Sequence, residues 1–455
     1  MVTLPYTGPV VLVQPAQTRL PPPTTIGDHR ESVSDRNRNI AADDTRAWGG
    51  IADRLVRVVF GLVLGLLISE FVARALVQFA APYSYNPIIR KQSEQAPFFV
   101  VDPDLGHRLR DGFVGVYQKG FVPWQQLVSE AATAQKAGRA VVLNVGDSST
   151  SGWNSNVIKS NRERAARGLP PLSPFQTYPT YSDQLKTDPK LYSINAGVPG
   201  YGATQGALFL QRILSDFHAA GVRPDIVTLY FGNNDSAWNG NVEDKYQFAG
   251  FLSLQLNGFQ VRRFINQMLN GSRIIPRTLP FDYGSRMKEM VDGARRAGAA
   301  VVLIEPAIPY AWPPALRADG LEEEVHLQRS ALRGTRVGQS LDDAMVFFDR
   351  GMQALKRGQL SEARGLLDQA RESDYILPRI KHAHQHVLTD DVMRALGVPL
   401  VSVSTELSQR VDDRDFFIDY CHPNEFGSKL IAERLRNVIS AALRAKNAAV
   451  DSKER

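Results

Sequence analysis

The chain has 455 residues, of which 43% are hydrophobic and 22% charged, so it is long enough for one large core with appendages. The net charge of +6 is spread thinly, and no basic run with interleaved aromatic residues occurs, so nucleic acid is not expected as a partner. The single cysteine, Cys421, excludes an intramolecular disulfide and leaves the redox compartment open.

The first element, residues 1–54, is polar, contains three consecutive prolines and lacks apolar periodicity, so we expect it to be disordered. Residues 55–81 are apolar but are interrupted by Arg57, Glu70 and Arg74. The uncharged core of this stretch is shorter than the ~20 residues that span a bilayer unaided, so a buried core helix and an interfacial helix are alternatives. Because Glu70 and Arg74 lie four apart and can neutralise each other, we favour a single-pass transmembrane helix.

Basic residues predict how this helix is oriented. Only Arg90 and Lys91 follow it closely, whereas several arginines precede or open it: Arg36, Arg38, Arg46, Arg54 and Arg57. The positive-inside rule therefore predicts a cytoplasmic N-terminus and an extracytoplasmic (periplasmic or extracellular) C-terminal part. A cleaved signal peptide is not expected, because the apolar region lies too deep in the chain.

From Ala140 onwards, short β-branched runs alternate with helical patterns, which predicts a parallel sheet covered by helices on both faces. The candidate strands are 140–145, 191–195, 225–231, 299–305 and 399–403. In open α/β sheets ligands bind beyond the carboxyl ends of the strands, where the polar blocks of this chain fall. We predict a flavodoxin-like three-layer α/β/α sandwich, preceded by an irregular segment at 82–137.

Four polar blocks recur in order along this part of the chain. They are Gly146-Asp147-Ser148, residues 195–200, residues 232–235, and Asp419 with His422. Together they offer a nucleophile, two candidate oxyanion donors, and a base with its orienting carboxylate, as acyl transfer through a serine ester requires. Alone, the first block is more simply a helix cap. The GxSxG elbow of α/β-hydrolases is absent, which removes that rival fold.

These blocks resemble the SGNH (GDSL-type) hydrolase superfamily from about residue 138 to 445. The segment GDSSTSG keeps the Gly-Asp-Ser core, Thr150 and Gly152 of one branch of that family, and departs from the signature at Ser149, where leucine is expected. That leucine takes no part in the chemistry. The resemblance implies the SGNH hydrolase fold, and serine chemistry needs neither a metal nor a cofactor.

In this interpretation Ser148 is the nucleophile, on a tight turn into a helix whose N-terminus favours developing negative charge. His422 is the general base, and Asp419 holds its imidazole in the correct tautomer. Pro423 fits the first position of the last helix.

The oxyanion hole combines the Ser148 backbone N–H with two further donors. Gly197 and Gly200 compete for the first, and the family pattern, with asparagine five residues before the donor glycine, selects Gly200. Asn233 and Asn234 compete for the second, a side-chain amide, and the family register selects Asn234.

Residues 344–374, within a helical insertion at 340–376, look like one tetratricopeptide repeat. Since one repeat normally needs about three neighbours, we interpret the insertion as a helical hairpin packed on the hydrolase core, with a docking site for a protein partner or a lid as alternatives.

His382, His384 and His386 lack the companion ligands of a zinc site, so no metal is expected there. Residues 101–109 look like a linker between a membrane anchor and a hydrolase domain, and are assigned no chemistry.

The leading hypothesis is a membrane-anchored serine esterase that hydrolyses short, acetyl-like acyl esters. Its substrate would be a small ester or an acylated glycan, such as an extracytoplasmic polysaccharide. The first alternative is an O-acyltransferase, in which a sugar hydroxyl resolves the same acyl-enzyme. The second is a non-catalytic membrane adaptor that binds partners through the hairpin.

Overall fold

The computed structural model describes residues 54–69, 72, 99–102, 104–109, 124–154, 167–168, 179–238, 274–317, 336–403 and 414–454. The segment expected to be disordered lies outside these ranges except for its last residue, and so does much of the irregular segment at 82–137. The chain divides into two units, Met1–Leu67 and Ile68–Arg455, which are described separately below.

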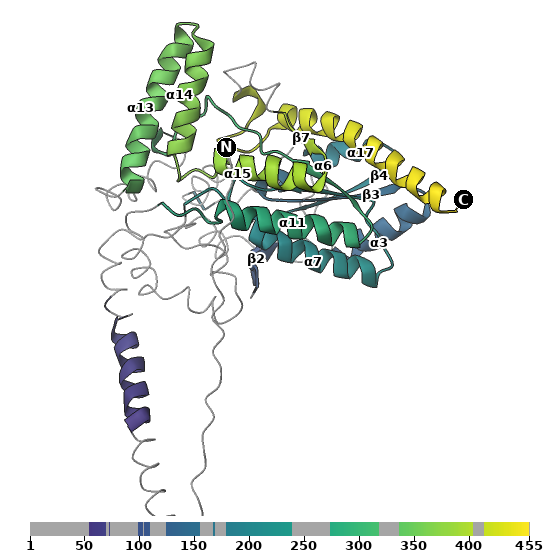
Figure 1. Ribbon diagram of the computed structural model, residues 1–455, viewed down its shortest axis with the longest axis horizontal. Coiled ribbons are helices and arrows are strands. Elements are labelled where there is room, and N and C mark those ends of the chain that lie inside the picture. Colours follow the sequence, from purple (N-terminus) through teal and green to yellow (C-terminus); the bar gives the residue numbers. More distant parts are fainter. Residues whose placement is uncertain are drawn as a thin grey trace, which may run out of the picture. The chain divides into compact units, whose positions relative to one another are not determined.

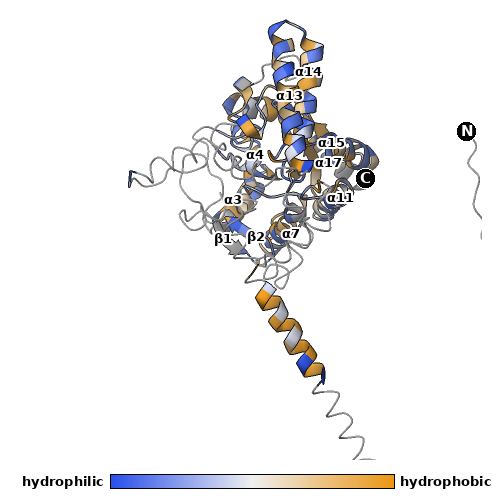
Figure 2. Cartoon of the chain, turned by 90° about the vertical axis from the view of Figure 1, so that its left-hand side faces the viewer, coloured by the Kyte–Doolittle hydropathy of each residue, from blue (hydrophilic) through white to orange (hydrophobic). Residues whose placement is uncertain are grey.

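Residues 54–69 are helical, and their apolar side chains are exposed, which Figure 2 shows as an orange helix. Within the described part of the chain, no helix combines the length and the apolar character needed to cross a membrane. Apart from Val72, the remainder of the predicted anchor, 70–81, lies outside the described residues.

Five parallel strands form the central sheet in the order β4-β3-β5-β6-β7. They are β3 (Ala140–Gly146), β4 (Leu191–Gly197), β5 (Ile226–Tyr230), β6 (Ala300–Ile304) and β7 (Leu400–Val401). In chain order this is 2-1-3-4-5, the order of flavodoxin-like sheets, and the predicted parallel sheet is confirmed. Gly146 pairs in register with Gly197 on one side and Tyr230 on the other, so three strands end side by side.

Helices cover both faces of the sheet with separate apolar clusters. One face packs against α3 (Trp124–Lys136), α7 (Ala203–Ala219), α11 (Pro280–Arg296) and the π-helix Val387–Arg394. The other packs against α6 (Tyr181–Leu185) and α17 (Glu425–Glu454). Figure 1 shows α7 and α11 on one side of the strands and α17 on the other. Burial on both faces explains why the strands are almost continuously apolar.

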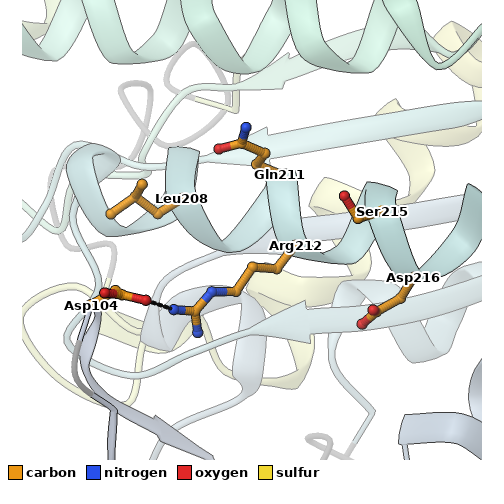
Figure 3. Close-up of a pocket in the computed structure, with 6 residues that line it drawn as sticks. All are labelled: Asp104, Leu208, Gln211, Arg212, Ser215 and Asp216. Atoms are coloured by element: carbon orange, nitrogen blue, oxygen red, sulfur yellow. Dashed lines mark hydrogen bonds and ion pairs between the residues drawn. The ribbon is translucent and has the colours of Figure 1, made fainter.

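A two-stranded antiparallel hairpin, β1 (Phe99–Asp102) and β2 (Gly106–Leu109), precedes the sheet. Arg212 of α7 donates to Asp102 at 2.7 Å and also pairs with Asp104, the contact drawn in Figure 3. The pocket beside this pair contains none of the predicted site residues; it is lined by Asp104, Leu208, Gln211, Arg212, Ser215 and Asp216. Leu105 is fully buried in the core, so the hairpin belongs to the folded domain.

The predicted helical insertion is a pair of helices, α13 (Arg336–Lys356) and α14 (Leu360–Ser373), which pack on each other (Figure 1). Their shared apolar cluster includes Ala354, Ala363 and Ala370. The first half of α13 packs in a second cluster with side chains of the loops that follow β5 and β6, among them Trp238 and Leu316. The pair therefore buries much of its apolar surface without further repeats, although Val346 and Leu360 are exposed.

The remaining described elements are short helices. They are α4 (Ser148–Ser151) at the carboxyl end of β3, η1 (Ala315–Arg317), α15 (His382–His386) and η3 (Arg414–Phe416).

A buried ionic cluster joins α14 to α15. In it Arg379 donates to Asp374 at 3.0 Å, and Lys381 Nζ donates to the Asp374 carbonyl at 2.8 Å. Burial lowers the pKa of Lys381 to about 7.

Candidate active site

Ser148 is the first residue of α4 (Ser148–Ser151), directly after β3. Asp147 caps this helix, because its carboxylate accepts a hydrogen bond from Ser149 N at 2.8 Å. Gly152, with φ 78°, ends the helix after a single turn. The expectation of a helix behind the nucleophile holds for that one turn only, so the helix dipole contributes little charge stabilisation there.

Two glycines let the strand ends approach this turn. A Cβ at Gly146 would lie 2.0 Å from Thr150 Oγ1, and one at Gly197 would lie 2.3 Å from Ser151 N. Neither glycine has a positive φ, so close approach rather than turn geometry requires glycine at both positions. The Asn195 amide adds to this packing by donating to the Thr150 carbonyl at 2.7 Å.

The loop after β4 makes a tight turn from Val198 to Tyr201, closed by a hydrogen bond from Tyr201 N to Val198 O at 3.2 Å. Pro199 and Gly200 are its central residues, and the φ of Gly200 is 84°, as the third residue of a type II turn requires. Among the hydrogen bonds of the described residues, none uses the N–H of Gly200 or that of Ser148. Both predicted backbone donors therefore remain available to a ligand.

Asn234 and Asn233 follow β5 and have different surroundings. The Asn234 amide nitrogen lies 3.0 Å from Tyr201 O and 3.4 Å from Asp147 Oδ2, between the turn and the nucleophile block. Asn233 Oδ1 instead accepts a hydrogen bond from Ile380 N at 3.1 Å, and its buried Nδ2 has no partner among the described residues. The geometry thus puts Asn234, rather than its neighbour, in contact with Asp147 and with the turn that contains Gly200.

His422 and Asp419 form a close buried pair. Nδ1 of His422 lies 2.6 Å from Asp419 Oδ2 and 2.8 Å from Oδ1, and because a carboxylate only accepts, Nδ1 carries the proton. Asp419 Oδ1 also accepts from the backbone N–H groups of Cys421 and His422, at 3.0 and 2.9 Å. These bonds fix both the ring and the carboxylate.

The last helix begins later than predicted. Asn424 caps it, since its side chain accepts from Phe426 N at 2.9 Å, and α17 starts at Glu425. The prediction that Pro423 occupies the first helical position is wrong. Pro423 precedes the cap and forms an isolated antiparallel bridge with Phe417.

Two carboxylates act on His422. Burial by itself would lower its pKa, but Asp419 and then Asp147 outweigh burial, and the pKa lies above the ordinary histidine value. For the carboxyl group of Asp147 burial has the opposite effect. It raises the pKa of Asp147 to about 6, although the hydrogen bond from Ser149 and the charge of His422 lower it. Asp147 was expected only as an alternative helix cap, and its electrostatic role had no signal in the sequence beyond its place in the Gly-Asp-Ser block.

The nucleophile turn and the histidine loop meet through Ser149, whose hydroxyl lies 3.4 Å from the Cys421 carbonyl oxygen. Within the described residues, no hydrogen bond joins Ser148 Oγ to His422. In ligand-free sites such catalytic contacts are often long and shorten when substrate binds. The structure thus brings the Ser148 turn, the Gly200 loop, Asn234 and the Asp419–His422 pair to one edge of the sheet.

Asp419, Cys421 and His422 also place potential metal-ligand atoms within 4.8 Å of one another. Burial and the Asp419 charge raise the pKa of the Cys421 thiol well above its usual value, which disfavours the thiolate that a metal needs.

The three histidines near residue 384 do not converge. His382 pairs with Asp368 at 2.9 Å, His386 pairs with Asp390 at 2.6 Å, and buried His384 donates from Nε2 to the Thr278 carbonyl at 2.8 Å. Each ring therefore has a partner of its own.

Part of the chain is similar to a known protein family. Residues 145–345 match the model of the GDSL-like Lipase/Acylhydrolase family. The matched range includes Ser148, Gly200 and Asn234 and ends before Asp419 and His422. A search of curated proteins gives no significant match.

Several solved structures are similar to the chain at low identity. An alpha/beta hydrolase enzyme from the metagenome of Lake Arreo has 14% identity and a TM-score of 0.32, covering 67% of this chain and 96% of that one. A GDSL-like lipase from Bacteroides thetaiotaomicron has 14% identity and a TM-score of 0.31, covering 70% and 97%. A mutant acetyl-xylooligosaccharide esterase from Geobacillus Stearmophilus has 12% identity and a TM-score of 0.31, covering 66% and 94%.

Proposed function

We propose that an acyl-enzyme forms on Ser148 of this chain, which carries a GDSL/SGNH hydrolase domain and is a carboxylic ester hydrolase. In the first step Ser148 Oγ attacks the ester carbonyl carbon while His422 Nε2 takes the hydroxyl proton. The imidazolium then gives that proton to the departing alkoxide. In the second step His422 activates water, which attacks the acyl carbon and releases the acid and Ser148.

Asp419 supports both steps by accepting the Nδ1 proton of His422, which leaves Nε2 free to act as the base. The negative charge on the carbonyl oxygen is stabilised by the N–H groups of Ser148 and Gly200 and by the Asn234 amide. These donors are neutral, so they do not first form an ion pair with a carboxylate.

One observation carries this proposal. A fully formed Asp419–His422 pair, at 2.6 Å, lies against the turn that bears Ser148, and two backbone N–H groups of the same site have no partner among the described residues. A surface histidine at the start of a helix is exposed even when it pairs with a carboxylate, as His382 does with Asp368. His422 is only 3% exposed, and burial of a charged pair is costly unless the pair has a function or full compensation.

We propose short, acetyl-like acyl esters on an extracytoplasmic polysaccharide as the substrate. The support for that location is the helix at 54–69, whose exposed apolar side chains suit a lipid environment, and the arginines that precede it. In this proposal residues 55–81 anchor the protein in the membrane, with the N-terminus cytoplasmic. For the α13–α14 pair, a docking site for a protein partner and a lid are the alternatives to a hairpin that only packs on the core.

The test is hydrolysis of p-nitrophenyl acetate by the full-length protein in detergent. We expect turnover by the wild type and a loss to near background in Ser148→Ala. Gly365→Ala, at an exposed site of α14 with open space around the added methyl group, is the matched control and should retain full turnover. Turnover that survives in Ser148→Ala would remove Ser148 from its proposed role. Weighing the products with a glycan present separates hydrolysis from acyl transfer.

A further inference from the structure

The peptide between Pro199 and Gly200 can take two orientations. Type I and type II turns differ mainly by a rotation of their central peptide through about 180°, and in this turn that peptide joins Pro199 to Gly200. Its N–H is the proposed oxyanion donor. A turn that relaxed towards type I would point this N–H away from the site, so the orientation of one peptide decides whether the donor is present.

A side chain from outside the central five-stranded sheet contacts this peptide. His107, in β2, has its Nε2 2.9 Å from the Pro199 carbonyl oxygen, although the two residues are 92 positions apart in the chain. A carbonyl oxygen only accepts, so Nε2 carries the proton and donates. In a trans peptide the C=O and N–H bonds point in opposite directions, and the bond from His107 therefore directs the Gly200 N–H to the opposite side.

The next peptide is held as well. Arg277 donates from Nη1 to the Gly200 carbonyl at 2.9 Å and from Nη2 to Gln205 Oε1 at 3.1 Å. The carbonyl groups on both sides of the Gly200 Cα, those of Pro199 and of Gly200 itself, are therefore held by hydrogen bonds.

His107 is itself held in place. The Tyr201 hydroxyl donates to the His107 carbonyl at 2.6 Å, and Gln205 donates to the Leu105 carbonyl at 2.7 Å. The rings of His107 and Tyr201 meet edge to face, with centroids 5.2 Å apart. Backbone and ring contacts together fix the hairpin against the turn.

The ring of His107 is also kept neutral. Burial lowers its pKa to about 4, and the positive charge of Arg277 acts in the same direction. The hydrogen bond to Pro199 and the negative charge of Asp102 oppose them. A neutral imidazole carries one N–H, and here that N–H is committed to Pro199. The contact therefore persists over the whole pH range in which His422 acts as a base.

We propose that His107 is a positioning residue for ester hydrolysis, which holds the Pro199–Gly200 peptide in the orientation that aims the Gly200 N–H into the oxyanion hole. This role rests on the proposed function. It assigns the β1–β2 hairpin a part in transition-state stabilisation, whereas the sequence alone suggested a linker.

Three substitutions at His107 and one control test the proposal. His107→Gln keeps an N–H donor of similar reach, His107→Asn has the same amide on a shorter side chain, and His107→Leu has no donor. Asp104→Asn weakens only the exposed part of the ion pairing between the hairpin and Arg212, and Asp102 still pairs with Arg212. It is the control for loosened hairpin docking.

With p-nitrophenyl acetate, we expect His107→Leu and His107→Asn to lower kcat by at least about 10-fold, towards the roughly 10²- to 10³-fold lost when one oxyanion donor is removed. KM should change little, and His107→Gln and Asp104→Asn should stay near the wild type. A wild-type kcat in His107→Leu, or equal losses in the Gln and Asn variants, would overturn the proposal. If the Leu variant does not fold, the Gln and Asn pair decides alone.

A double-mutant cycle separates positioning from general loosening. Gly200→Ala strains the positive φ and acts on the same donor, so its effect and that of His107→Leu should not add. Asn234→Ala removes a different donor, and there the effects should add. Additive losses with Gly200→Ala would overturn the role. If wild-type turnover does not depend on Ser148, both the proposed function and the role of His107 are overturned. If turnover depends on Ser148 but is unaffected by His107→Leu, only the role of His107 is overturned.

Discussion

At the scale of single residues, the proposed base is controlled by charge and by hydrogen-bond direction. Asp419 receives the Nδ1 proton of His422, and Asp147 approaches from the nucleophile side. Both carboxylates favour the imidazolium form that arises when Ser148 is deprotonated. The low polarity of the buried site strengthens these interactions relative to water.

Asp419→Asn should keep the fold and lose activity. The Asn oxygen can still accept from the N–H groups of Cys421 and His422, while its NH₂ replaces the oxygen that faces Nδ1. That amide favours the tautomer with the proton on Nε2, which cannot accept a proton from Ser148. We expect kcat to fall by about 10³- to 10⁴-fold with a nearly unchanged melting temperature. An Asn variant with undiminished kcat would require another group to hold His422.

The pH profile of kcat/KM should rise with pH, with a midpoint above the ordinary histidine value of about 6.5. The pKa of His422 is raised, and the ring must be neutral to accept the Ser148 proton, so activity is lost as pH falls through that pKa. Asp147→Asn removes one of the two negative charges and should move the midpoint to lower pH. The two groups are coupled, so the midpoint belongs to both. An unmoved or raised midpoint in Asp147→Asn would contradict this account.

At the scale of elements, the ends of three neighbouring strands position the site. Gly146 and Gly197 lie side by side at the ends of β3 and β4 and allow the α4 turn to pack directly on the strand backbones. Such contact leaves no space for a methyl group. The nucleophile is therefore positioned by rigid elements rather than by a long loop.

Gly197→Ala should displace this turn, because the added Cβ would lie 2.3 Å from Ser151 N, a backbone atom that cannot move alone. We expect a loss of stability of about 1–3 kcal/mol and a marked fall in kcat. Gly365→Ala adds the same methyl group in open space on α14 and should stabilise the fold by about 0.5–1 kcal/mol. Thermal unfolding of both variants checks this, and equal melting temperatures would contradict the packing argument.

Sequence reasoning predicted the sheet because its strands are short apolar runs rich in β-branched residues, and the first three each run into a polar block. The strand that ends just before Asp147 and Ser148 is a clear example. It missed the contact of His107 with Pro199, because a hydrogen bond across 92 residues leaves no periodic or spacing signal. It also misplaced the start of the last helix, since proline at a first helical position and proline just before a cap give similar local sequences.

At the scale of the whole molecule, the N-terminal helix and the hydrolase domain use apolar residues differently. In the domain they are buried on both faces of the sheet, whereas between residues 54 and 69 they are exposed. An isolated apolar helix in water is unfavourable, because each exposed Leu or Phe side chain forgoes about 1.5–3 kcal/mol of burial. A lipid bilayer would supply that burial.

Leu62→Lys with Leu66→Lys should therefore abolish binding of the full-length protein to lipid vesicles, because two charges enter the apolar stretch. The matched control is Val346→Lys with Leu360→Lys, two exposed apolar residues of the α13–α14 pair, which should leave vesicle binding unchanged. Cosedimentation with vesicles measures both. Full binding by the Leu62/Leu66 variant would contradict the proposed anchor.

An activated Ser148 should react with a fluorophosphonate, and intact mass measurement after that reaction shows the adduct on the protein itself. We expect one phosphonyl adduct on the wild-type protein, an adduct that forms far more slowly in His422→Ala, and none in Ser148→Ala. Gly365→Ala should react as the wild type does. An unmodified wild-type protein, or an adduct that persists in Ser148→Ala, would contradict the role of Ser148 as the nucleophile.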